Sequence, residues 1–269
     1  MHYVIPSVAE GCFCTRIMNK QEALFKYILR LADNDLILGH RVSEWTGHGP
    51  MLEEDLALAN IALDLIGNAN SLYQYAVKVE GKGRTEDDLA YMRGERDFYN
   101  TLLAEHPNGD YACTMVRQFF TDAFYIHYYE DLKSSADATL AALAAKALKE
   151  VNYHLRHSSS WIERFGDGTE ESHMRAQNAI NELWRYTEEL FDMNEVDAIL
   201  IKEKIAVDLA PVKAKWEKTV NDVLVRSTLE KPQNVWQQRG SRDGKHTEHL
   251  GYLLAEMQHL HRAIPGANW

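Results

Sequence analysis

The sequence predicts an all-α protein, a helical bundle that carries further helices at its C-terminal end. The six prolines fall at the edges of long stretches with helical periodicity, where a missing N–H does no harm. Alternation of polar and apolar residues, which marks strands, is scarce, whereas runs rich in Ala and Leu favour helix interiors. Helices of the predicted length are typical of bundles.

Each element is placed by its periodicity and by the Gly-rich or Pro-containing segments that bound it. The polar segment 230–245, which contains Gly and Pro, is the best candidate for an exposed loop and is too short for a domain linker. Helices are expected near residues 20–46, 51–80, 85–105, 110–132, 137–164, 170–191, 195–204, 208–229 and 246–262.

A chain of 269 residues can bury roughly 70–75% of its unfolded surface, which supports a core without disulfides or metals. We expect residues 1–17 to be an N-terminal extension outside the core and 18–269 to form a single domain. The chain has 40 acidic and 29 basic residues, and its net charge of -11 argues against binding to nucleic acid or anionic membranes.

The compartment is predicted from the cysteines and from the absence of targeting signals. Three cysteines, Cys12, Cys14 and Cys113, cannot pair completely, and this favours reduced thiols in a cytoplasm. No apolar run approaches the ~20 residues of a membrane span, and the first residues lack the pattern of a signal peptide. Cys113 is expected to be a buried, unreactive side chain.

Four predicted helices each carry one side chain that can bind a metal on an otherwise apolar face. Asp35 follows Ile28 and Leu31 on the first helix, and the second reads LALANIALDLI around Asp64. The stripes of 110–132 and 137–164 contain Asp122 and His154 in the same way. The bundle core is therefore expected to collect three carboxylates and an imidazole.

Carboxylate-bridged di-iron sites in bundles use one Glu from each of two helices and a Glu-x-x-His pair from each of the other two. Here that set is incomplete, because Gly67 follows Asp64 by three residues and Val151 precedes His154 by three. Neither can bind a metal. The favoured alternative is that the buried acids form ion pairs, since unpaired burial would cost several kcal/mol. The neighbouring bases considered are Arg30, Arg41, Arg117 and Arg156.

Literal Glu-x-x-His matches occur elsewhere, at Glu170/His173 and Glu256/His259. Glu170 is expected in the first turn of a helix capped by Thr169. The second pair belongs to a group of histidines on the last helix, His246, His249, His259 and His261, which is an alternative metal site. Histidines on an amphipathic helix are more often surface or hydrogen-bonded core residues.

Aromatic residues near polar ones could serve an interface or the core. Trp236, Trp269 and the stretch YIHYYE at 125–130 are the candidates, and for the Tyr-rich stretch the core is favoured.

Several blocks resemble the C subunits of bacterial phenylacetyl-CoA epoxidases, multicomponent oxygenases of phenylacetate breakdown. The likeness spans roughly Met18 to Trp269 and is most specific in the last block. The blocks are LRLADNDLILGHRVSEWTGHGPMLEEDLALANIALDLIGNA, EHPNGDYACTMVRQFFTDAF, KALKEVNYHLRHSSSWIERFGDGTE, RYTEELFD and GKHTEHLGYLLAEMQHLHRAIPGANW.

The resemblance implies a ferritin-like bundle that serves as the structural partner of a related catalytic A subunit, which holds the di-iron centre and the CoA thioester. It implies no cofactor in this chain, and contacts through the complex with a small B subunit and a reductase. Degenerate di-iron positions would then be Asp35, Asp64, Gly67, Asp122, Val151 and His154, with no ligand role. Glu150, next to Val151, is one residue out of phase and is not counted as a replacement.

Three hypotheses follow. The first is a non-catalytic subunit of a complex that epoxidises the ring of phenylacetyl-CoA with dioxygen and NADPH. The second is an active di-iron oxygenase with a smaller, Asp-based ligand set. The third is a metal-binding helical protein centred on His246, His249 and Glu256. The missing ligands favour the first.

Overall fold

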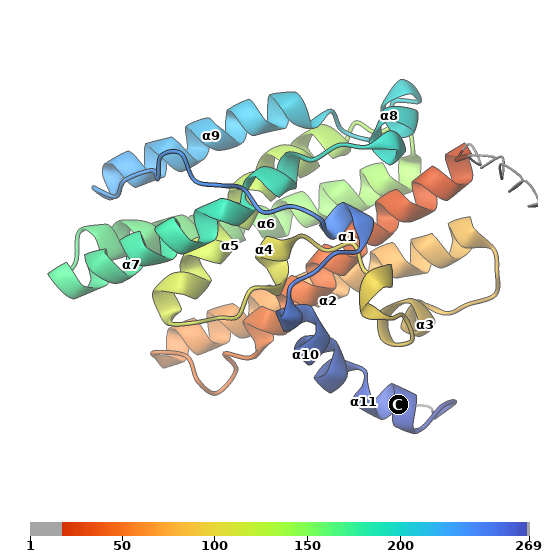
Figure 1. Ribbon diagram of the computed structural model, residues 1–269, viewed down its shortest axis with the longest axis horizontal. Coiled ribbons are helices and arrows are strands. Elements are labelled where there is room, and N and C mark those ends of the chain that lie inside the picture. Colours follow the sequence, from red (N-terminus) through yellow and green to blue (C-terminus); the bar gives the residue numbers. More distant parts are fainter. Residues whose placement is uncertain (1–17, 268–269) are drawn as a thin grey trace, which may run out of the picture.

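The computed structural model describes residues 18–267 (Figure 1). These residues form α-helices, four short 3-10 helices and no strand, so the predicted all-α class is confirmed for the described part of the chain. The expected extension at 1–17 lies outside the described residues, and the domain boundaries stay a prediction. The α-helices are α1 (Lys20–Ser43), α2 (Leu52–Glu80), α3 (Glu86–Tyr91), α4 (Leu102–Glu105), α5 (Tyr111–Leu132), α6 (Ala138–Gly166), α7 (Glu170–Leu183), α8 (Glu195–Lys202), α9 (Leu209–Arg226), α10 (Glu248–Met257) and α11 (His259–Ala263).

Four long helices, α1, α2, α5 and α6, build the bundle. α1 packs along α2, α5 packs along α6, and α2 also contacts α6. A long crossover at residues 81–110 joins the two hairpins, which is a connection found in ferritin-like folds. α7 and α9 cover the outside of α5, and α8 packs against α1. α10 and α11, near the C-terminus, extend away from the long helices (Figure 1). The bundle is ferritin-like, as the resemblance implies.

Local signals in the sequence fix the ends of the long helices. Asn19 caps α1 in a capping box with Glu22, and the Asp137 carboxylate accepts hydrogen bonds from the first amides of α6. Gly81 ends α2 in the left-handed conformation, with φ of 67°, which a glycine adopts at little cost.

The prediction of one helix at 85–105 is wrong. The segment contains α3, a 3-10 turn at Glu95–Asp97 and α4, separated by extended backbone. Buried carboxylates from other parts of the fold accept hydrogen bonds from backbone amides that would otherwise bond within a helix. Tyr99 N donates to Asp33 Oδ2 at 2.8 Å, and Leu102 N donates to Glu189 Oε2 at 2.8 Å. These tertiary hydrogen bonds replace the helical ones.

Two other predicted helices are interrupted. α7 stops at Leu183 and is followed by 3-10 turns at Trp184–Tyr186 and Glu188–Phe191, where the Thr187 hydroxyl donates to Trp184 O at 2.9 Å. The last helix is divided into α10 and α11 at Gln258. The buried Gln258 amide donates to the carbonyls of Ala90 and Arg93 on the crossover and so holds the break in place.

The segment 230–245 has no α-helix, but it is not exposed throughout as predicted. Its C-terminal part carries a 3-10 turn at Ser241–Asp243, and Ser241 is fully buried. The Glu189 carboxylate accepts from the amides of Gly240, at 2.7 Å, and Ser241, at 2.9 Å. A buried anion therefore fastens this loop to the bundle.

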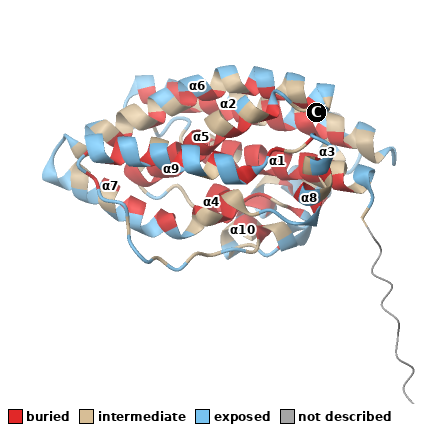
Figure 2. Ribbon diagram, turned by 90° about the horizontal axis from the view of Figure 1, so that it is seen from above, coloured by how far each residue is buried: buried red, intermediate tan, exposed pale blue. Residues whose placement is uncertain are grey.

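Buried residues line the inner faces of the helices in one continuous core (Figure 2). Tyr125, Tyr128 and Tyr129 are buried, which confirms the core prediction for the Tyr-rich stretch, whereas Trp236 is exposed. Cys113 is buried as expected, and burial raises the pKa of its thiol to about 11. Cys12, Cys14 and Trp269 lie outside the described residues. Among the described helices none is long and apolar enough to cross a membrane.

Candidate functional site

Asp35, Asp64, Asp122 and His154 come together in the middle of the bundle, one from each long helix. Asp35, Asp122 and His154 are buried, whereas the Asp64 side chain is 36% exposed. His154 stands at the centre, because it bonds to Asp64 and its charge acts on the pKa of both Asp35 and Asp122. The helical stripes thus predicted the location of this cluster.

Asp35 is surrounded by neutral hydrogen-bond donors. Tyr125 donates to Asp35 Oδ1 at 2.5 Å, Asn68 Nδ2 donates to Oδ2 at 2.5 Å, and the Tyr129 hydroxyl lies 3.4 Å from Oδ2. Burial raises the pKa of Asp35 to about 6, against the effect of these hydrogen bonds. Both oxygens of the carboxylate are therefore occupied.

Asp122 is occupied in the same manner. Gln118 Nε2 donates to Oδ1 at 2.7 Å and Ser158 Oγ donates to Oδ2 at 2.7 Å. Burial raises the pKa of Asp122 to about 6, and the nearby His154 opposes this shift.

His154 bonds to Asp64, with 3.0 Å between Nε2 and Oδ2. Burial alone would lower the pKa of His154, but the hydrogen bond to Asp64 and the charge of Asp122 outweigh it, so the pKa is raised. The other ring nitrogen, Nδ1, is buried without a hydrogen-bond partner in the structure.

A void of about 10 Å³ lies between Asp35, Asp64 and His154, close to the least space that one water molecule needs. Val151 lines it with an apolar side chain, and Glu150 also reaches it, although its carboxylate pairs with Lys146 at 3.7 Å. Gly67 does not line this void, and a Cβ added to it would meet open space. Asn68, one residue further, takes the inward place.

The predicted ion pairs between these acids and nearby arginines are wrong. Arg30 pairs with Asp197. Arg41 donates to the carbonyl of Glu105 and forms an ion pair with Glu44. Arg117 donates to the carbonyl of His106 and to the side chain of Asn108. Arg156 lies over the Tyr153 ring. The acids are instead stabilised by tyrosine, amide and serine donors and, for Asp64, by His154, while the four arginines contact other residues.

The histidines near the C-terminus do not converge. His246 is enclosed by Glu105, with Nδ1 2.7 Å from Oε2, and by the Phe98 carbonyl, 2.9 Å from Nε2. His261 stacks on Tyr91, and the His249 ring lies 6.0 Å from that of His106. Glu256 and His259 are exposed, and Thr169 caps α7 at Glu170 as predicted.

The geometry does not fit a di-iron centre. Val151 offers no ligand atom, Gly67 lies outside the void, and the buried carboxylates already accept short hydrogen bonds from protein donors. Within residues 18–267, no three His, Cys, Asp or Glu side chains are placed to share a metal ion. Sequence reasoning missed Asn68, Tyr125, Tyr129, Gln118 and Ser158. For Gln118 the available signal was its position one helical turn before Asp122, whereas Tyr125, Tyr129 and Ser158 reach the acids from other helices.

Replacement of Asp122 by Asn should leave the fold intact and raise the free energy of unfolding at pH 7 by about 1–3 kcal/mol. The pKa of this carboxyl is about 6 in the folded chain and takes its ordinary value of 3.8 in the unfolded chain. Stability therefore falls as pH rises through that window, and Asn removes the loss. Ser158 can rotate its hydroxyl to accept from the new amide.

Urea unfolding at pH 7 and pH 5 measures the effect, which should be smaller at pH 5. Asp131→Asn is the matched control, because Asp131 forms a partly exposed pair with Lys215. A loss of more than about 2 kcal/mol in Asp122→Asn would show that the negative charge itself is needed at this position.

The chain matches the profile of a family described as phenylacetic acid catabolic protein over residues 15–269. It is also 50% identical over 246 residues to the C subunit of the 1,2-phenylacetyl-CoA epoxidase of Escherichia coli strain K12, an alignment that covers 91% of this chain and 99% of that protein. A match of this extent, together with the ferritin-like bundle, establishes the relationship. The chain belongs to the family of phenylacetic acid catabolic proteins.

Proposed function

We propose that this chain is the non-catalytic structural subunit of a cytoplasmic, multicomponent phenylacetyl-CoA epoxidase. The observation that carries the proposal is the state of the bundle centre. Both carboxylate oxygens of Asp35 and of Asp122 accept hydrogen bonds from protein donors, and Val151 takes a ligand position. Supporting it, the relative from Escherichia coli is named as the C subunit of such an enzyme.

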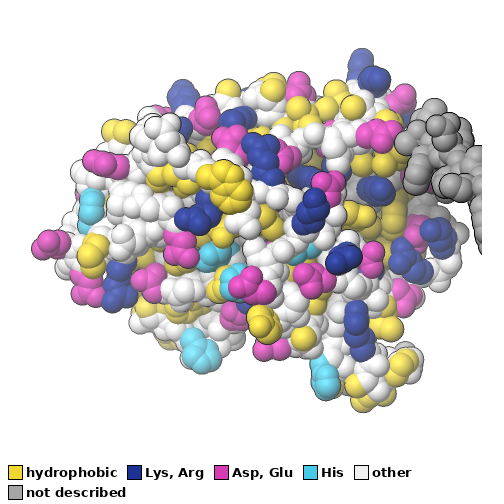
Figure 3. Space-filling model, viewed as in Figure 1, with side chains coloured by type: hydrophobic (Ala, Val, Ile, Leu, Met, Phe, Trp, Pro, Cys, Tyr) yellow, Lys and Arg dark blue, Asp and Glu magenta, His cyan; other side chains and the backbone are white. Residues whose placement is uncertain are grey.

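In this proposal the related A subunit holds the di-iron centre and the CoA thioester, and a reductase supplies electrons from NADPH. The present chain, with a small B subunit, completes the assembly. Its net charge of -11 suits it poorly to bind polyanionic CoA alone. On the face drawn in Figure 3, Lys and Arg side chains are interspersed with Asp and Glu and form no large basic patch.

A structural subunit needs a surface for its partner, and the outer face of α2 offers one. Leu52, Leu56 and Leu63 follow one stripe of the helix, which also carries the exposed Asn60, and the three leucines are 70%, 56% and 68% exposed. Gly67 continues the stripe without a side chain, with open space in front of it. We assign this α2 stripe to a helix of the related catalytic subunit, because a leucine row beside a glycine lets a second bundle approach closely.

Metal analysis of the purified chain tests the proposal. We expect far less than one iron per chain after expression in iron-rich medium, and iron only when the A subunit is co-purified. Near-stoichiometric iron in this chain alone, lost in a folded Asp122→Ala/His154→Ala variant, would instead establish the second function, an Asp-based di-iron oxygenase. The buried proximity of Asp122 and His154 is the observation that keeps that candidate open.

Leu63→Glu should reduce the yield of the co-purified complex at least about tenfold, because it places a charge in an apolar contact. The free chain should unfold at the same temperature as the parent, since Leu63 is exposed. Val225→Glu on α9 is the control, because Val225 is equally exposed on a different helix. Equal recovery of the Leu63→Glu complex would place the interface elsewhere.

A further inference from the structure

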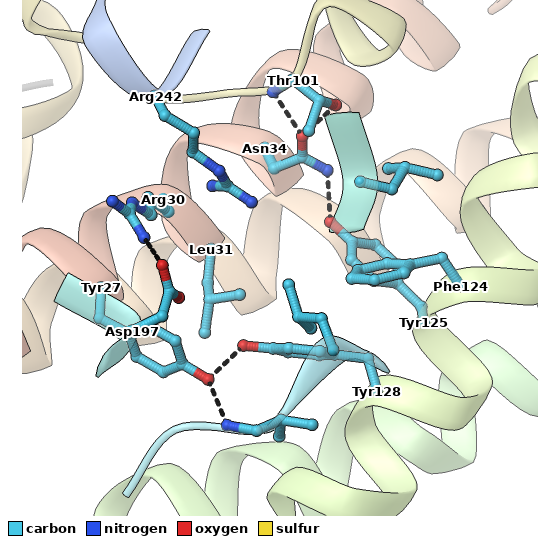
Figure 4. Close-up of a pocket in the computed structure, with 13 residues that line it drawn as sticks. Tyr27, Arg30, Leu31, Asn34, Thr101, Phe124, Tyr125, Tyr128, Asp197 and Arg242 are labelled. Atoms are coloured by element: carbon cyan, nitrogen blue, oxygen red, sulfur yellow. Dashed lines mark hydrogen bonds and ion pairs between the residues drawn. The ribbon is translucent and has the colours of Figure 1, made fainter. Parts of the chain in front are cut away.

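A second cavity, of about 40 Å³, lies between α1, α5 and the loop that carries Arg242 (Figure 4). It is separate from the void at Asp35, although Tyr125 lines both. Aromatic and aliphatic side chains form most of its wall, and two guanidinium groups enter it, those of Arg30 and Arg242. The cavity has no role in the function proposed above.

Arg30 is only 5% exposed, and its hydrogen bonds are incomplete. Nη1 donates to Asp197 Oδ2 at 2.9 Å and Nη2 donates to Asn194 Oδ1 at 2.7 Å. Nε, on the remaining edge, is buried without a partner. A buried donor of this kind is costly unless a ligand or water accepts from it.

Arg242 projects into the cavity from the short turn at Ser241–Asp243 (Figure 4). Its Nε is also buried without a partner, and the structure gives this guanidinium no hydrogen bond and no ion pair among residues 18–267. Asp192, the acid whose charge reaches it, forms an ion pair with Arg239. All the donors of Arg242 are thus available to a ligand.

The two arginines repel one another. Burial lowers the pKa of Arg30, and the charge of Arg242 lowers it further, against the attraction of Asp197. Arg30, Arg242 and Asp197 are the charged side chains of the wall, which leaves one positive charge in excess. A partly enclosed cationic site stays costly until a counter-charge enters it.

One further donor faces the cavity. The hydroxyls of Tyr27 and Tyr128 lie 2.6 Å apart, and the amide of Val207 also donates to Tyr27. Whichever hydroxyl donates to the other, the accepting hydroxyl still has its own O–H available to donate. Two guanidinium edges and a phenol hydroxyl therefore offer donors to the cavity, against the single carboxylate of its wall, Asp197.

We propose that this cavity binds a small monovalent oxyanion, of the carboxylate or bicarbonate class, between the guanidinium groups of Arg30 and Arg242. The planar fork of a guanidinium matches two oxygens on one carbon. The volume admits three or four heavy atoms and is far below the ~150 Å³ that takes a benzene ring. Because Arg242 belongs to the loop and Arg30 to α1, the anion would join the C-terminal segment to the bundle.

Binding is measured with the full chain and with ¹³C-formate and ¹³C-bicarbonate as probes, followed by the broadening of their NMR lines and by the temperature of unfolding. Sodium gluconate, a carboxylate too large for the cavity, keeps the ionic strength constant. We expect saturable broadening by both probes and a saturable rise in the unfolding temperature. Arg242→Gln should weaken binding at least about tenfold, since it removes charge-assisted hydrogen bonds.

Arg226→Gln is the matched control, with the same loss of charge on α9, where Arg226 pairs with Glu163 away from the cavity. It should bind like the parent, and Arg242→Lys should bind better than Arg242→Gln. A non-saturable response, or equal binding by Arg242→Gln and the parent, would overturn the proposal. Sulfate binding as tight as formate binding would overturn the assignment to a small monoanion.

Discussion

Arg93→Met is expected to destabilise the chain by about 3–5 kcal/mol, a large part of the 5–15 kcal/mol of a typical domain. Arg93 is buried on the crossover and forms an ion pair with Asp33, which is fully buried on α1. Without the guanidinium, the Asp33 carboxylate would remain in the core with no opposite charge.

The pair is the centre of a larger network. Arg93 Nη1 also donates to Asp97 O at 2.7 Å, and its guanidinium lies 4.2 Å from the centre of the Phe98 ring. Tyr73 donates to Asp33 Oδ1 at 2.6 Å. Burial alone would lower the pKa of Arg93, but Asp33 raises it above its ordinary value, which is the sign of a favourable pair.

The midpoint and slope of urea unfolding at pH 7 measure the loss. Arg175→Met is the matched control, because Arg175 forms an exposed pair with Glu171 and its loss should leave the free energy of unfolding almost unchanged. If Arg93→Met and Arg175→Met lost the same small amount, the buried network would not hold the crossover.

The long helices could be predicted from the sequence because their determinants are local. Periodic apolar stripes, the capping box of Asn19 and the terminal Gly81 lie within the helices or beside them. The crossover could not be predicted, because its amides bond to Asp33 and Glu189, which are far away in the sequence. Tertiary hydrogen bonds of this kind leave no periodic signal.

The inward positions of Asp35, Asp122 and His154 followed from the same stripes. Their partners did not, since each depends on which helix lies opposite. Tyr125 reaches Asp35 across the bundle, and Arg30 turns to Asp197, 167 residues away. Asn68, rather than Gly67, points inward because each residue turns the helix by 100°. The positions three and four residues after Asp64 therefore share its face only partly.

The pair of His246 and Glu105 gives the second large effect. His246 meets the carboxylate of Glu105 through Nδ1 and the carbonyl of Phe98 through Nε2. Both partners are acceptors, so both ring nitrogens must carry a proton and the imidazole is a cation. The two side chains are fully buried, and together they fasten the chain before α10 to the end of α4.

Burial alone would lower the pKa of His246, but the hydrogen bond and charge of Glu105 raise it above 6.5. A raised pKa means that the folded state keeps a proton that the unfolded state releases. The stabilisation is therefore complete below pH 6.5 and is lost as pH rises through the pKa of the folded state. The free energy of unfolding should fall above neutral pH.

His246→Gln removes the cation and leaves Glu105 buried, and we expect a loss of about 3–5 kcal/mol at pH 6. The difference from the parent should be smaller at pH 9 than at pH 6, because the imidazole of the parent gives up its proton as the pH rises. His259→Gln, at an exposed histidine of α11, should keep the pH profile of the parent. Urea unfolding at the two pH values decides, and a constant difference would mean that His246 stabilises the chain by packing rather than by charge. Asn100 and Thr247 also donate to Glu105, so the carboxylate keeps partners when the imidazole is gone. We therefore expect His246→Gln to fold, so that its unfolding can be measured.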